Sequence, residues 1–401
     1  MFSGQANPPE VGKECYDKGK LTFCFRLSET AMKLFRFFRN DWTVSLLLVA
    51  ALIAARGLFL ANVIRGRYAI SSMLADIALA CGLVVILRLL NTGLQKLLDN
   101  RADDAASLPK LLAQTARCLI LTVIAGPFFL TTFQLRPPKI GCLENPASRY
   151  GLDYSDVTLE TEDGLQLAAW HVPAEQPGRP ILVITHGLGA NKDNFLITMK
   201  LAHEAGYDAL LYDARAHGDS QGSVCSLGVH EAKDVKAAYD WAARKFPGRP
   251  IYAWGNSVGG AGVLRAAAEY GIFEKIVIDA SFSSIRSVSK QTRLGYLGPF
   301  EKPVWALASL WYWTWTQRDI NASSPRDHIA AIADRPLFLI HGTADGVVPV
   351  TEAGKLYEAS GRRAELWLVE GAGHSASMGR PEYVQRLRAF YEGQDHGGST
   401  E

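Results

Sequence analysis

IYAWGNSVGG, residues 251–260, places Ser257 between two glycines at the point where an apolar run gives way to an alanine-rich segment. A serine on a sharp turn from a strand into a helix needs small residues two positions before and after it, because the chain folds back on itself there. Gly255 and Gly259 meet that requirement. The start of the following helix also favours the negative charge of a developing oxyanion. We therefore expect Ser257 to be a nucleophile, with a glycine-rich packing turn as the alternative.

Apolar, strand-like runs alternate with helix-length segments on both sides of this turn. Uniformly apolar strands that alternate with helices favour a mainly parallel sheet with helices on both faces. Glu162-Asp163-Gly164 between the first two runs is a hairpin signal, which adds an antiparallel edge. The eight runs lie at 157–161, 165–172, 181–185, 208–212, 251–254, 275–279, 337–340 and 365–369, and the longest helical segments at 191–204, 229–245 and 258–270. The predicted fold class is α/β, and ligands should bind at the carboxyl ends of the strands.

The turn His186-Gly187-Leu188-Gly189 directly follows the run at 181–185. In that position a backbone amide can face the oxygen of a reacting carbonyl group. We expect the amides of Leu188 and Val258 to form an oxyanion hole together. His186 itself fits a structural hydrogen-bonding role better than the role of a base.

Two further post-strand segments supply an acid and a base. HGTAD (341–345) follows one run and GAGH (371–374) follows the next. His374 can take the proton from the serine and return it to the leaving group, while Asp345 orients the imidazole. Asp279, at the end of its own run, is the alternative acid. His217 is the only other histidine that we expect beside the site.

From about residue 150 to 392 the chain resembles the α/β-hydrolase superfamily, in its branch of esterases, lipases and acyl-peptidase-like enzymes. The motifs that carry this resemblance are GNSVG (255–259), HGLG (186–189), HGTAD and GAGH, with the serine, acid and histidine in the order typical of the family. DARAHGDS (213–220) is similar to the family's D-x-R-G-H-G-x-S loop, with Ala216 where the family usually has glycine. The resemblance implies an α/β-hydrolase fold with an eight-stranded sheet, a Ser257-Asp345-His374 triad, and no metal or organic cofactor.

The alternating pattern pauses between about residues 285 and 328, where WALASLWYWTW (305–315) is unusually aromatic. We expect a small cap over the serine, in which Trp311, Trp313 and Trp315 shape an apolar acyl-binding pocket. Placement of these tryptophans at a bilayer surface and ordinary core packing are the two alternatives.

Three apolar stretches precede the catalytic region, at 43–64, 68–90 and 118–135. Each is close to the roughly 20 residues that a helix needs to cross a hydrocarbon core. They predict a transmembrane region over 43–135 with about three helices. A buried helical domain is the alternative, and a cleaved signal peptide fits less well because its apolar part should be shorter and nearer the N-terminus.

Positive charge gathers in residues 1–42 and in the loop between the second and third stretches, which places both in the cytoplasm. With three spans, the catalytic domain lies on the extracytoplasmic side of a cell (inner) membrane, and with two spans the side reverses. Arg56 and Asp76 should reach similar depth in the first two helices and pair there. The remaining boundaries are a linker at 136–150, a catalytic domain at 151–392 with its cap, and a disordered tail at 393–401.

Composition disfavours several other functions. A net charge of +2 without a long basic run argues against a nucleic-acid partner. The six cysteines form neither a CxxC pair nor a Cys/His cluster, which disfavours a structural zinc site. A Cys142–Cys225 disulfide is neither predicted nor excluded. We expect a membrane-anchored serine hydrolase of an acyl ester or thioester, whose partners are a lipid or small-molecule acyl substrate and the bilayer. A peptidase or amidase and a non-catalytic binding domain are the rival interpretations.

Overall fold

The computed structural model describes residues 127–128, 131–132, 134–175, 178–292, 294–332 and 334–393. The predicted cytoplasmic segment, the first two apolar stretches, most of the third, the Arg56–Asp76 pair and nearly all of the predicted tail lie outside these residues. Within the described ranges, no helix combines the length and the hydropathy needed to cross a membrane.

Eight strands form one sheet in the described part of the chain, at the positions of the eight apolar runs. They are β1 (Ser155–Glu160), β2 (Gln166–Val172), β3 (Ile181–Thr185), β4 (Asp208–Tyr212), β5 (Ile251–Asn256), β6 (Ile276–Asp279), β7 (Leu337–Gly342) and β8 (Glu365–Val369). Their order in the sheet is β1-β2-β4-β3-β5-β6-β7-β8. β2 runs antiparallel to both β1 and β4, whereas every later pair is parallel. The predicted α/β fold, mainly parallel with an antiparallel opening hairpin, is confirmed.

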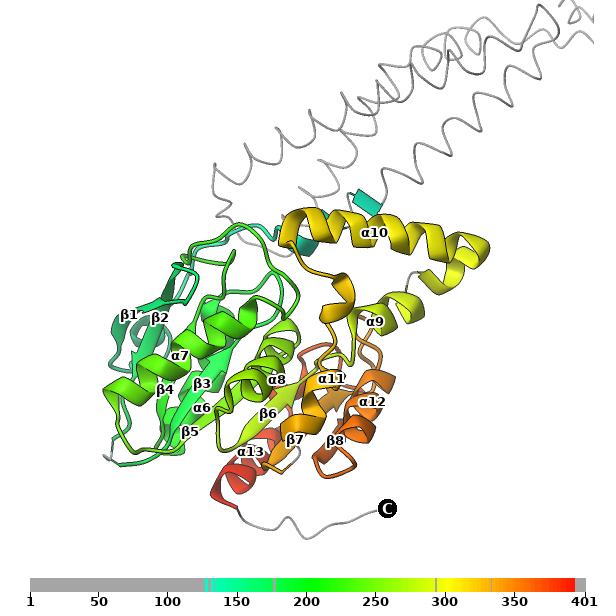
Figure 1. Ribbon diagram of the computed structural model, residues 1–401. Helices are drawn as coiled ribbons and strands as arrows, with labels where there is room; N and C mark the ends of the chain where they lie inside the picture. Colours follow the sequence, from blue (N-terminus) through cyan, green and yellow to red (C-terminus); the bar gives the residue numbers. More distant parts are fainter. Residues whose placement is uncertain are drawn as a thin grey trace, which may run out of the picture. The chain divides into compact units, whose positions relative to one another are not determined.

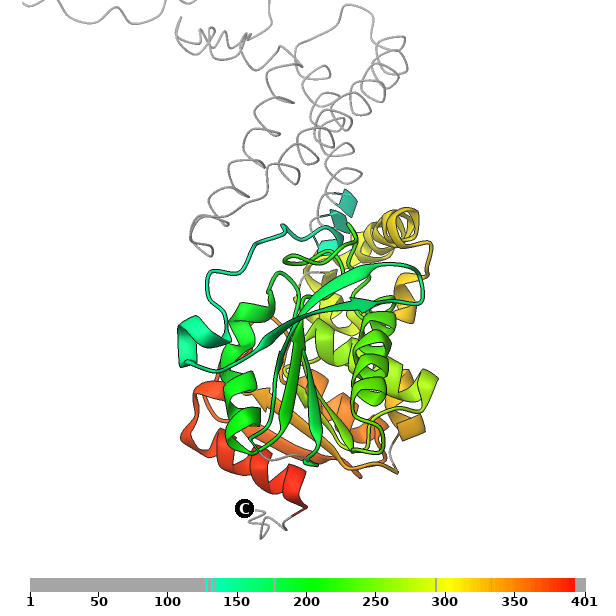
Figure 2. The same ribbon diagram turned by 90° about the vertical axis from the view of Figure 1, so that its left-hand side faces the viewer.

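Helices cover both faces of the sheet (Figures 1 and 2). α7 (Glu231–Lys245), α8 (Val258–Tyr270), α11 (Arg326–Ile329) and α12 (Thr351–Ala359) pack on one face, and α6 (Leu196–Glu204) and α13 (Pro381–Glu392) on the other. Short elements complete the two layers: α5 (Pro146–Tyr150), η1 (Lys192–Phe195), η4 (Ala330–Ile332) and η5 (Ser377–Gly379).

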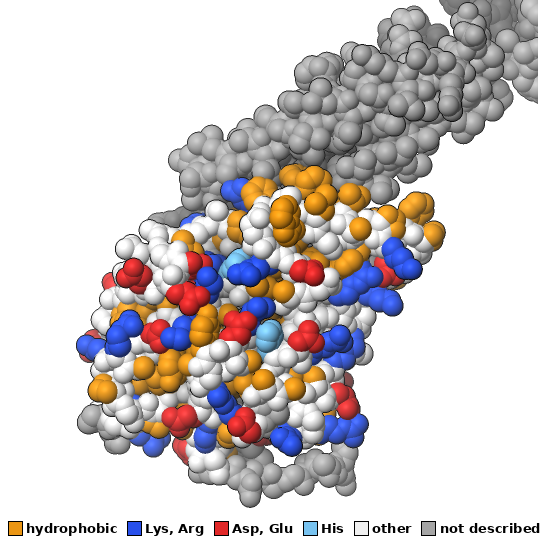
Figure 3. All heavy atoms as spheres, in the orientation of Figure 1, with side chains coloured by type: hydrophobic (Ala, Val, Ile, Leu, Met, Phe, Trp, Pro, Cys, Tyr) orange, Lys and Arg blue, Asp and Glu red, His pale blue; other side chains and the backbone are white. Residues whose placement is uncertain are grey.

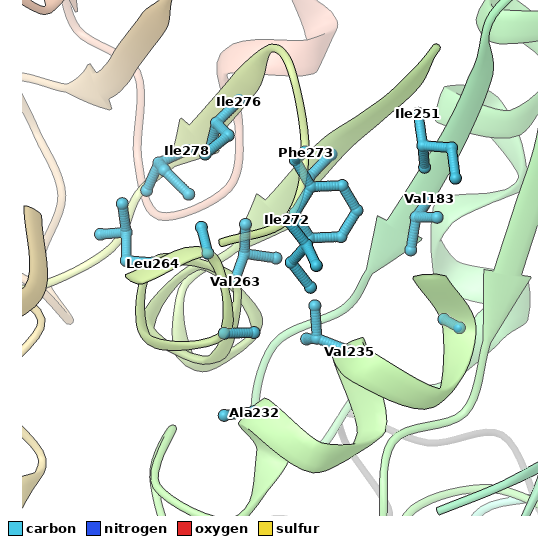
Figure 4. Packing of buried hydrophobic residues seen from close by; sticks show 14 of the residues in the cluster. Val183, Ala232, Val235, Ile251, Val263, Leu264, Ile272, Phe273, Ile276 and Ile278 are labelled. Atoms are coloured by element: carbon cyan, nitrogen blue, oxygen red, sulfur yellow. The ribbon is translucent and has the colours of Figure 1, made fainter. Parts of the chain in front are cut away.

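Alternate side chains of the central strands pack into two separate hydrophobic cores, one on each face of the sheet. Along β5, Ile251 and Ala253 belong to the core under α7 and α8, whereas Tyr252 and Trp254 belong to the core under α6 and α13. This follows from the two-residue period of a strand, whose successive side chains point to opposite faces. Figure 4 shows the first core, with Val263 of α8 turned toward the sheet residues. Because both faces are covered, the strands are apolar throughout.

Further helices interrupt the α/β pattern between β6 and β7, and we call them the cap. It consists of α9 (Ile285–Thr292), η2 (Leu294–Phe300), α10 (Glu301–Thr316) and η3 (Ile320–Ala322). A third apolar cluster joins it to the sheet and includes Val258, Phe282, Tyr312 and Val348. The cap therefore packs on the residues that follow β5, β6 and β7.

The chain enters this domain at Leu135, which is fully buried in the same cluster. Its carbonyl accepts a 2.7 Å hydrogen bond from the amide of Cys225. The predicted linker at 136–150 holds the short helix α5, whose first turn is capped by Asn145. The Leu143 amide donates to Asp193 Oδ2 at 2.6 Å, and Asn191 Nδ2 donates to the Ile140 carbonyl at 3.1 Å, so this segment is bonded to the domain that follows it.

Candidate active site

Ser257 lies on the sharp turn between β5 and α8, with φ 52° and ψ −117°. This conformation is unfavourable for a residue with a Cβ atom, and such strain is typical of functional positions. Two hydrogen bonds hold it: the Ser257 amide donates to the Asp279 carbonyl at 2.9 Å, and Ser281 Oγ donates to the Ser257 carbonyl at 2.7 Å. The side chain is 7% exposed. The turn thus presents one hydroxyl group at the carboxyl ends of the strands.

Two glycines around Ser257 permit backbones to approach too closely for any side chain. A Cβ atom at Gly259 would lie 2.4 Å from the His186 carbonyl oxygen, and one at Gly255 would lie 2.7 Å from Gly260 Cα. These contacts explain physically why the pattern around the serine has small residues at both positions.

Asp345 and His374, predicted from separate post-strand loops, are in direct contact. His374 Nδ1 donates to Asp345 Oδ2 at 2.7 Å. The other carboxylate oxygen accepts the amides of Val347 and Val348, both at 2.8 Å. Burial opposes ionisation of Asp345, but hydrogen bonds from His341, His374 and the Val348 amide outweigh it and lower its pKa. Asp345 is therefore a carboxylate suited to hold an imidazole and stabilise its charged form.

Asp279, the alternative acid, has different partners. It is fully buried and accepts a 3.0 Å hydrogen bond from Tyr383 Oη, which in turn accepts one from Trp254 Nε1 at 2.9 Å. Burial raises the pKa of Asp279 to about 6, although the Tyr383 hydroxyl favours the charged form. The geometry thus assigns the contact with His374 to Asp345.

A hydrogen bond that the sequence did not predict joins the serine turn to the histidine loop. Ser375 Oγ donates to Asn256 Oδ1 at 3.0 Å, so the neighbours of His374 and Ser257 are linked. Asn256 Nδ2 donates to the Asp279 carbonyl at 3.2 Å, the same carbonyl that accepts the Ser257 amide. Ser375 has φ 57°, a strained conformation like that of Ser257. The two loops are therefore held in a fixed relation.

Two buried histidines support the turn that carries Leu188. The Ala214 amide donates to His186 Nε2 at 3.0 Å, and the Gly189 amide donates to His217 Nε2 at 3.0 Å. Burial lowers the pKa of His186, and it lowers that of His217 to about 3, where the neighbouring His186 acts in the same direction. Both imidazoles are neutral acceptors. This agrees with the structural role expected for His186 and gives His217 a similar one.

The loop DARAHGDS braces the same region. Asp213 accepts Lys192 Nζ at 2.7 Å and the Asp219 amide at 2.9 Å. A Cβ atom at Gly218 would lie 2.2 Å from the Asp213 carboxylate. Ala216 has φ 63°, which favours glycine and accounts for the usual residue at this position.

Of the described residues, only Cys142, Asp213 and Asp219 group metal-type ligand atoms, all within 4.8 Å of one another. Lys192 Nζ already lies 2.7 Å and 2.8 Å from the two carboxylates and supplies the positive charge. Burial raises the pKa of the Cys142 thiol to about 12, which disfavours a metal-binding thiolate. Cys142 and Cys225 are both free thiols.

The three tryptophans predicted to bind substrate have different environments. Trp313 is 52% exposed, while Trp311 packs edge-on against Phe128 at 4.9 Å between ring centroids. Trp315 Nε1 donates to Thr132 Oγ1 at 3.2 Å. The cluster that reaches Val258 includes Trp315 at its margin. An acyl-binding role for the three stays a prediction.

Comparison with known proteins agrees with the fold. A family described as the alpha/beta hydrolase fold matches residues 180–310, and a partial alpha/beta-hydrolase lipase region matches residues 144–199. Among curated proteins, the chain is similar to a lysophosphatidylserine lipase of Danio rerio, with 23% identity over 63% of this chain and 67% of the relative. An uncharacterized membrane protein of Saccharomyces cerevisiae is 25% identical over 54% of this chain and 71% of its own length.

Among solved structures, an esterase of Pyrococcus furiosus is similar, with a TM-score of 0.53 and 23% identity. The match covers 65% of this chain and 99% of the esterase. At this identity the likeness establishes the shared fold.

Proposed function

Because the chain belongs to the α/β-hydrolase superfamily and is a hydrolase, we propose that it cleaves an acyl ester or thioester through Ser257, His374 and Asp345. The observation that carries this proposal is the 2.7 Å bond between His374 and Asp345 on a loop tied to the Ser257 turn. We further propose that the domain is anchored to a membrane by the apolar stretches before it.

The chemistry begins with transfer of the Ser257 hydroxyl proton to His374 Nε2, as Oγ attacks the acyl carbonyl carbon. The amides of Leu188 and Val258 bind the oxyanion, with the field of the α8 N-terminus in support. His374 then gives the proton to the leaving alcohol or thiol, which departs and leaves an acyl-serine. Water, deprotonated by His374, hydrolyses that ester and restores the serine.

Asp345 keeps the imidazole in the tautomer that has Nδ1 protonated, which leaves Nε2 free to accept the serine proton. Its lowered pKa keeps the carboxylate ionised throughout the cycle, so it stabilises the imidazolium that forms. No step needs a metal or an organic cofactor.

The lipase and esterase names of the relatives support a lipid or other hydrophobic acyl ester as substrate. The apolar cluster from Val258 to Tyr312 supports the same class, because it gives the region beside the serine an apolar character. We propose that Trp311 and Trp315 border the acyl chain, whereas Trp313 is half-exposed and faces away from these contacts.

The test is labelling of the full chain by a fluorophosphonate probe, which reacts with activated serines. We expect labelling of the wild type and none of Ser257→Ala. Ser148→Ala, an exposed serine that caps α5, is the matched control and should label normally. Absence of labelling in folded wild-type protein would exclude the hydrolase mechanism and favour a binding domain.

A second comparison separates an esterase from a peptidase or amidase, which the same triad serves. We expect p-nitrophenyl esters to be cleaved with a preference that rises with acyl length, and aminoacyl anilides to be poor substrates. The reverse preference would assign the site to peptides.

A further inference from the structure

The cap exposes a group of large apolar side chains, which we call the cap face: Tyr296, Leu297, Phe300, Leu310 and Trp313. Their exposed fractions are 84%, 37%, 58%, 50% and 52%. Five of the nine exposed large hydrophobic residues in the described part of the chain thus lie within one 18-residue stretch. Figure 3 shows hydrophobic side chains gathered over α10 and η2. Such a concentration marks an interaction surface rather than ordinary scatter.

The opposite side of α10 is occupied. Tyr312 is fully buried and donates to the Ser226 carbonyl at 2.7 Å. Trp311 and Trp315 contact Phe128 and Thr132, as described above. The helix therefore has an inner side that is packed and an outer side, with Leu310 and Trp313, that is not.

The inner contacts place α10 beside the end of an apolar segment. Phe128 and Thr132 belong to residues 118–135, an 18-residue stretch without a charged residue. That stretch has the length and composition of a membrane-crossing helix. A helix packed against its last turns is at the level where a hydrocarbon core would give way to headgroups.

The charge of the cap fits the same surroundings. Residues 285–318 contain five basic residues and one acidic residue, a net charge of +4, in a chain whose total is +2. Lys290, Lys302 and Arg318 are exposed. Tryptophan, tyrosine and basic residues together are characteristic of segments that lie in the interface of anionic bilayers.

We infer that the cap face lies in the headgroup layer of an anionic bilayer and that the active site receives its acyl substrate from that bilayer. The substrate class is then a membrane lipid whose ester group can leave the bilayer while its acyl chain stays in apolar surroundings. Leu188 and Val347, in two loops beside the site, are also exposed, by 36% and 59%. The part concerning substrate rests on the proposed function, whereas the part concerning the bilayer does not.

The bilayer contact is tested with the full chain reconstituted in phosphatidylcholine–phosphatidylglycerol vesicles whose acyl chains are brominated. Bromine quenches the fluorescence of tryptophans that it touches. We expect Trp313→Phe to remove part of the quenched emission. Trp241→Phe, at a partly buried residue of α7 that packs against the core, should remove only unquenched emission. Equal quenched fractions in the two variants would overturn the inference and assign the cap face to residues 1–126 or to a second copy of the chain.

Substrate delivery is tested with Phe300→Glu combined with Leu310→Glu. Charges on the cap face should reduce hydrolysis of a lysophospholipid embedded in the anionic vesicles by about ten-fold, because they weaken insertion into the interface. Hydrolysis of water-soluble p-nitrophenyl acetate should not change. The control pair Leu143→Glu with Leu368→Glu, exposed leucines outside the cap, should leave both rates unchanged.

The two proposals fail in different ways. If Ser257→Ala kept both the lysophospholipid and the p-nitrophenyl acetate activity, the serine mechanism would be contradicted, while the quenching result would be unaffected. Wild-type rates on vesicle lipid in the cap variant would overturn delivery from the bilayer, even with the serine mechanism established.

Discussion

Asn256 bonds two parts of the site through the two ends of its amide. Its Oδ1 accepts Ser375 Oγ, and its Nδ2 donates to the Asp279 carbonyl. Proton transfer between a serine and a histidine depends on their separation to a fraction of an ångström, so a bond between their neighbours affects the rate. In the proposed mechanism, Asn256 is accordingly a positioning residue rather than a catalytic one.

We expect Ser375→Ala to lower kcat for a short ester by about ten-fold with little change in KM, because the His374 loop loses its bond to the serine turn. Asn256→Ala should act in the same direction. The double variant should be no slower than the slower single variant, because both single variants already lack the Asn256–Ser375 bond. Steady-state kinetics measure this, and multiplicative effects would show that the two residues act separately.

At the scale of single residues, the sequence predicts those that lie within a recognisable local motif. Ser257, Asp345 and His374 each follow a strand and lie in a glycine-containing motif, which is a local pattern. The Asn256–Ser375 bond and the support of Gly189 by His217 join residues 119 and 28 positions apart. Nothing in either local pattern indicates such a partner, because the pairing depends on how the loops cross.

The attachment of α9 to α12 depends on one buried carboxylate. Glu352 is fully buried, and its two oxygens accept hydrogen bonds from the Ser283 amide and hydroxyl and from Ser287 Oγ. Lys355 Nζ lies 2.7 Å away. Burial opposes ionisation, but these donors outweigh it and lower the pKa of Glu352. Its contribution to stability is therefore present at neutral pH and is lost as pH falls through the lowered pKa.

Replacement of Glu352 by glutamine should reduce the free energy of unfolding by about 2–3 kcal/mol, because an NH₂ group would face several donors. Hydrogen exchange should increase first in α9. Glu358→Gln removes a similar charge from the exposed face of α12 and should change stability far less, because solvent screens an exposed charge. Equal effects from the two variants in urea unfolding would show that Glu352 does not anchor the cap.

Elements differ in how well the sequence predicts them. The strands were predicted to within about two residues at each end, because buried parallel strands are short apolar runs between turn signals. The cap was located but its arrangement was not. An aromatic helix such as α10 fits a core, a pocket wall and a bilayer surface equally well until its two sides are known.

The pH dependence of the unfolding free energy of the whole domain should contain a contribution from Asp279. The folded protein raises its pKa to about 6, above the value of about 4 for an unfolded chain, so it holds the proton more tightly than the unfolded chain does. The folded state is thus favoured at low pH, and this advantage is lost as pH rises from about 4 to about 6. It amounts to about 3 kcal/mol.

We expect Asp279→Asn to flatten that dependence, because the amide cannot titrate. Between about pH 4 and about pH 7, the unfolding free energy of the wild type should fall by about 2 kcal/mol relative to that of the variant, as measured by chemical unfolding at both pH values. An unaltered pH dependence would mean that Asp279 does not titrate in this range. The acid assigned to the mechanism is tested by the same variant, which should retain the triad and its probe labelling.

Across the molecule, the sheet and its topology class were predictable because four motifs each follow their own strand. The contacts that attach the entering segment to the domain were not predictable. Residues 136–150 look like a linker in sequence, with three prolines and mixed polarity, yet they hold α5 and are bonded to the domain. Such contacts depend on the position of the segment in the folded chain, and that position cannot be read from its composition.

The burial of Leu135 and its bond to Cys225 have a consequence for how far the enzyme can travel. The apolar stretch ends at a residue that is already part of the folded domain. An anchored catalytic domain would therefore have no flexible linker on which to move away from the membrane. Its reach would be confined to lipids that diffuse laterally past it. Turnover would then follow the surface density of substrate in its own bilayer, and dilution of the vesicles at constant composition would leave the rate per enzyme unchanged.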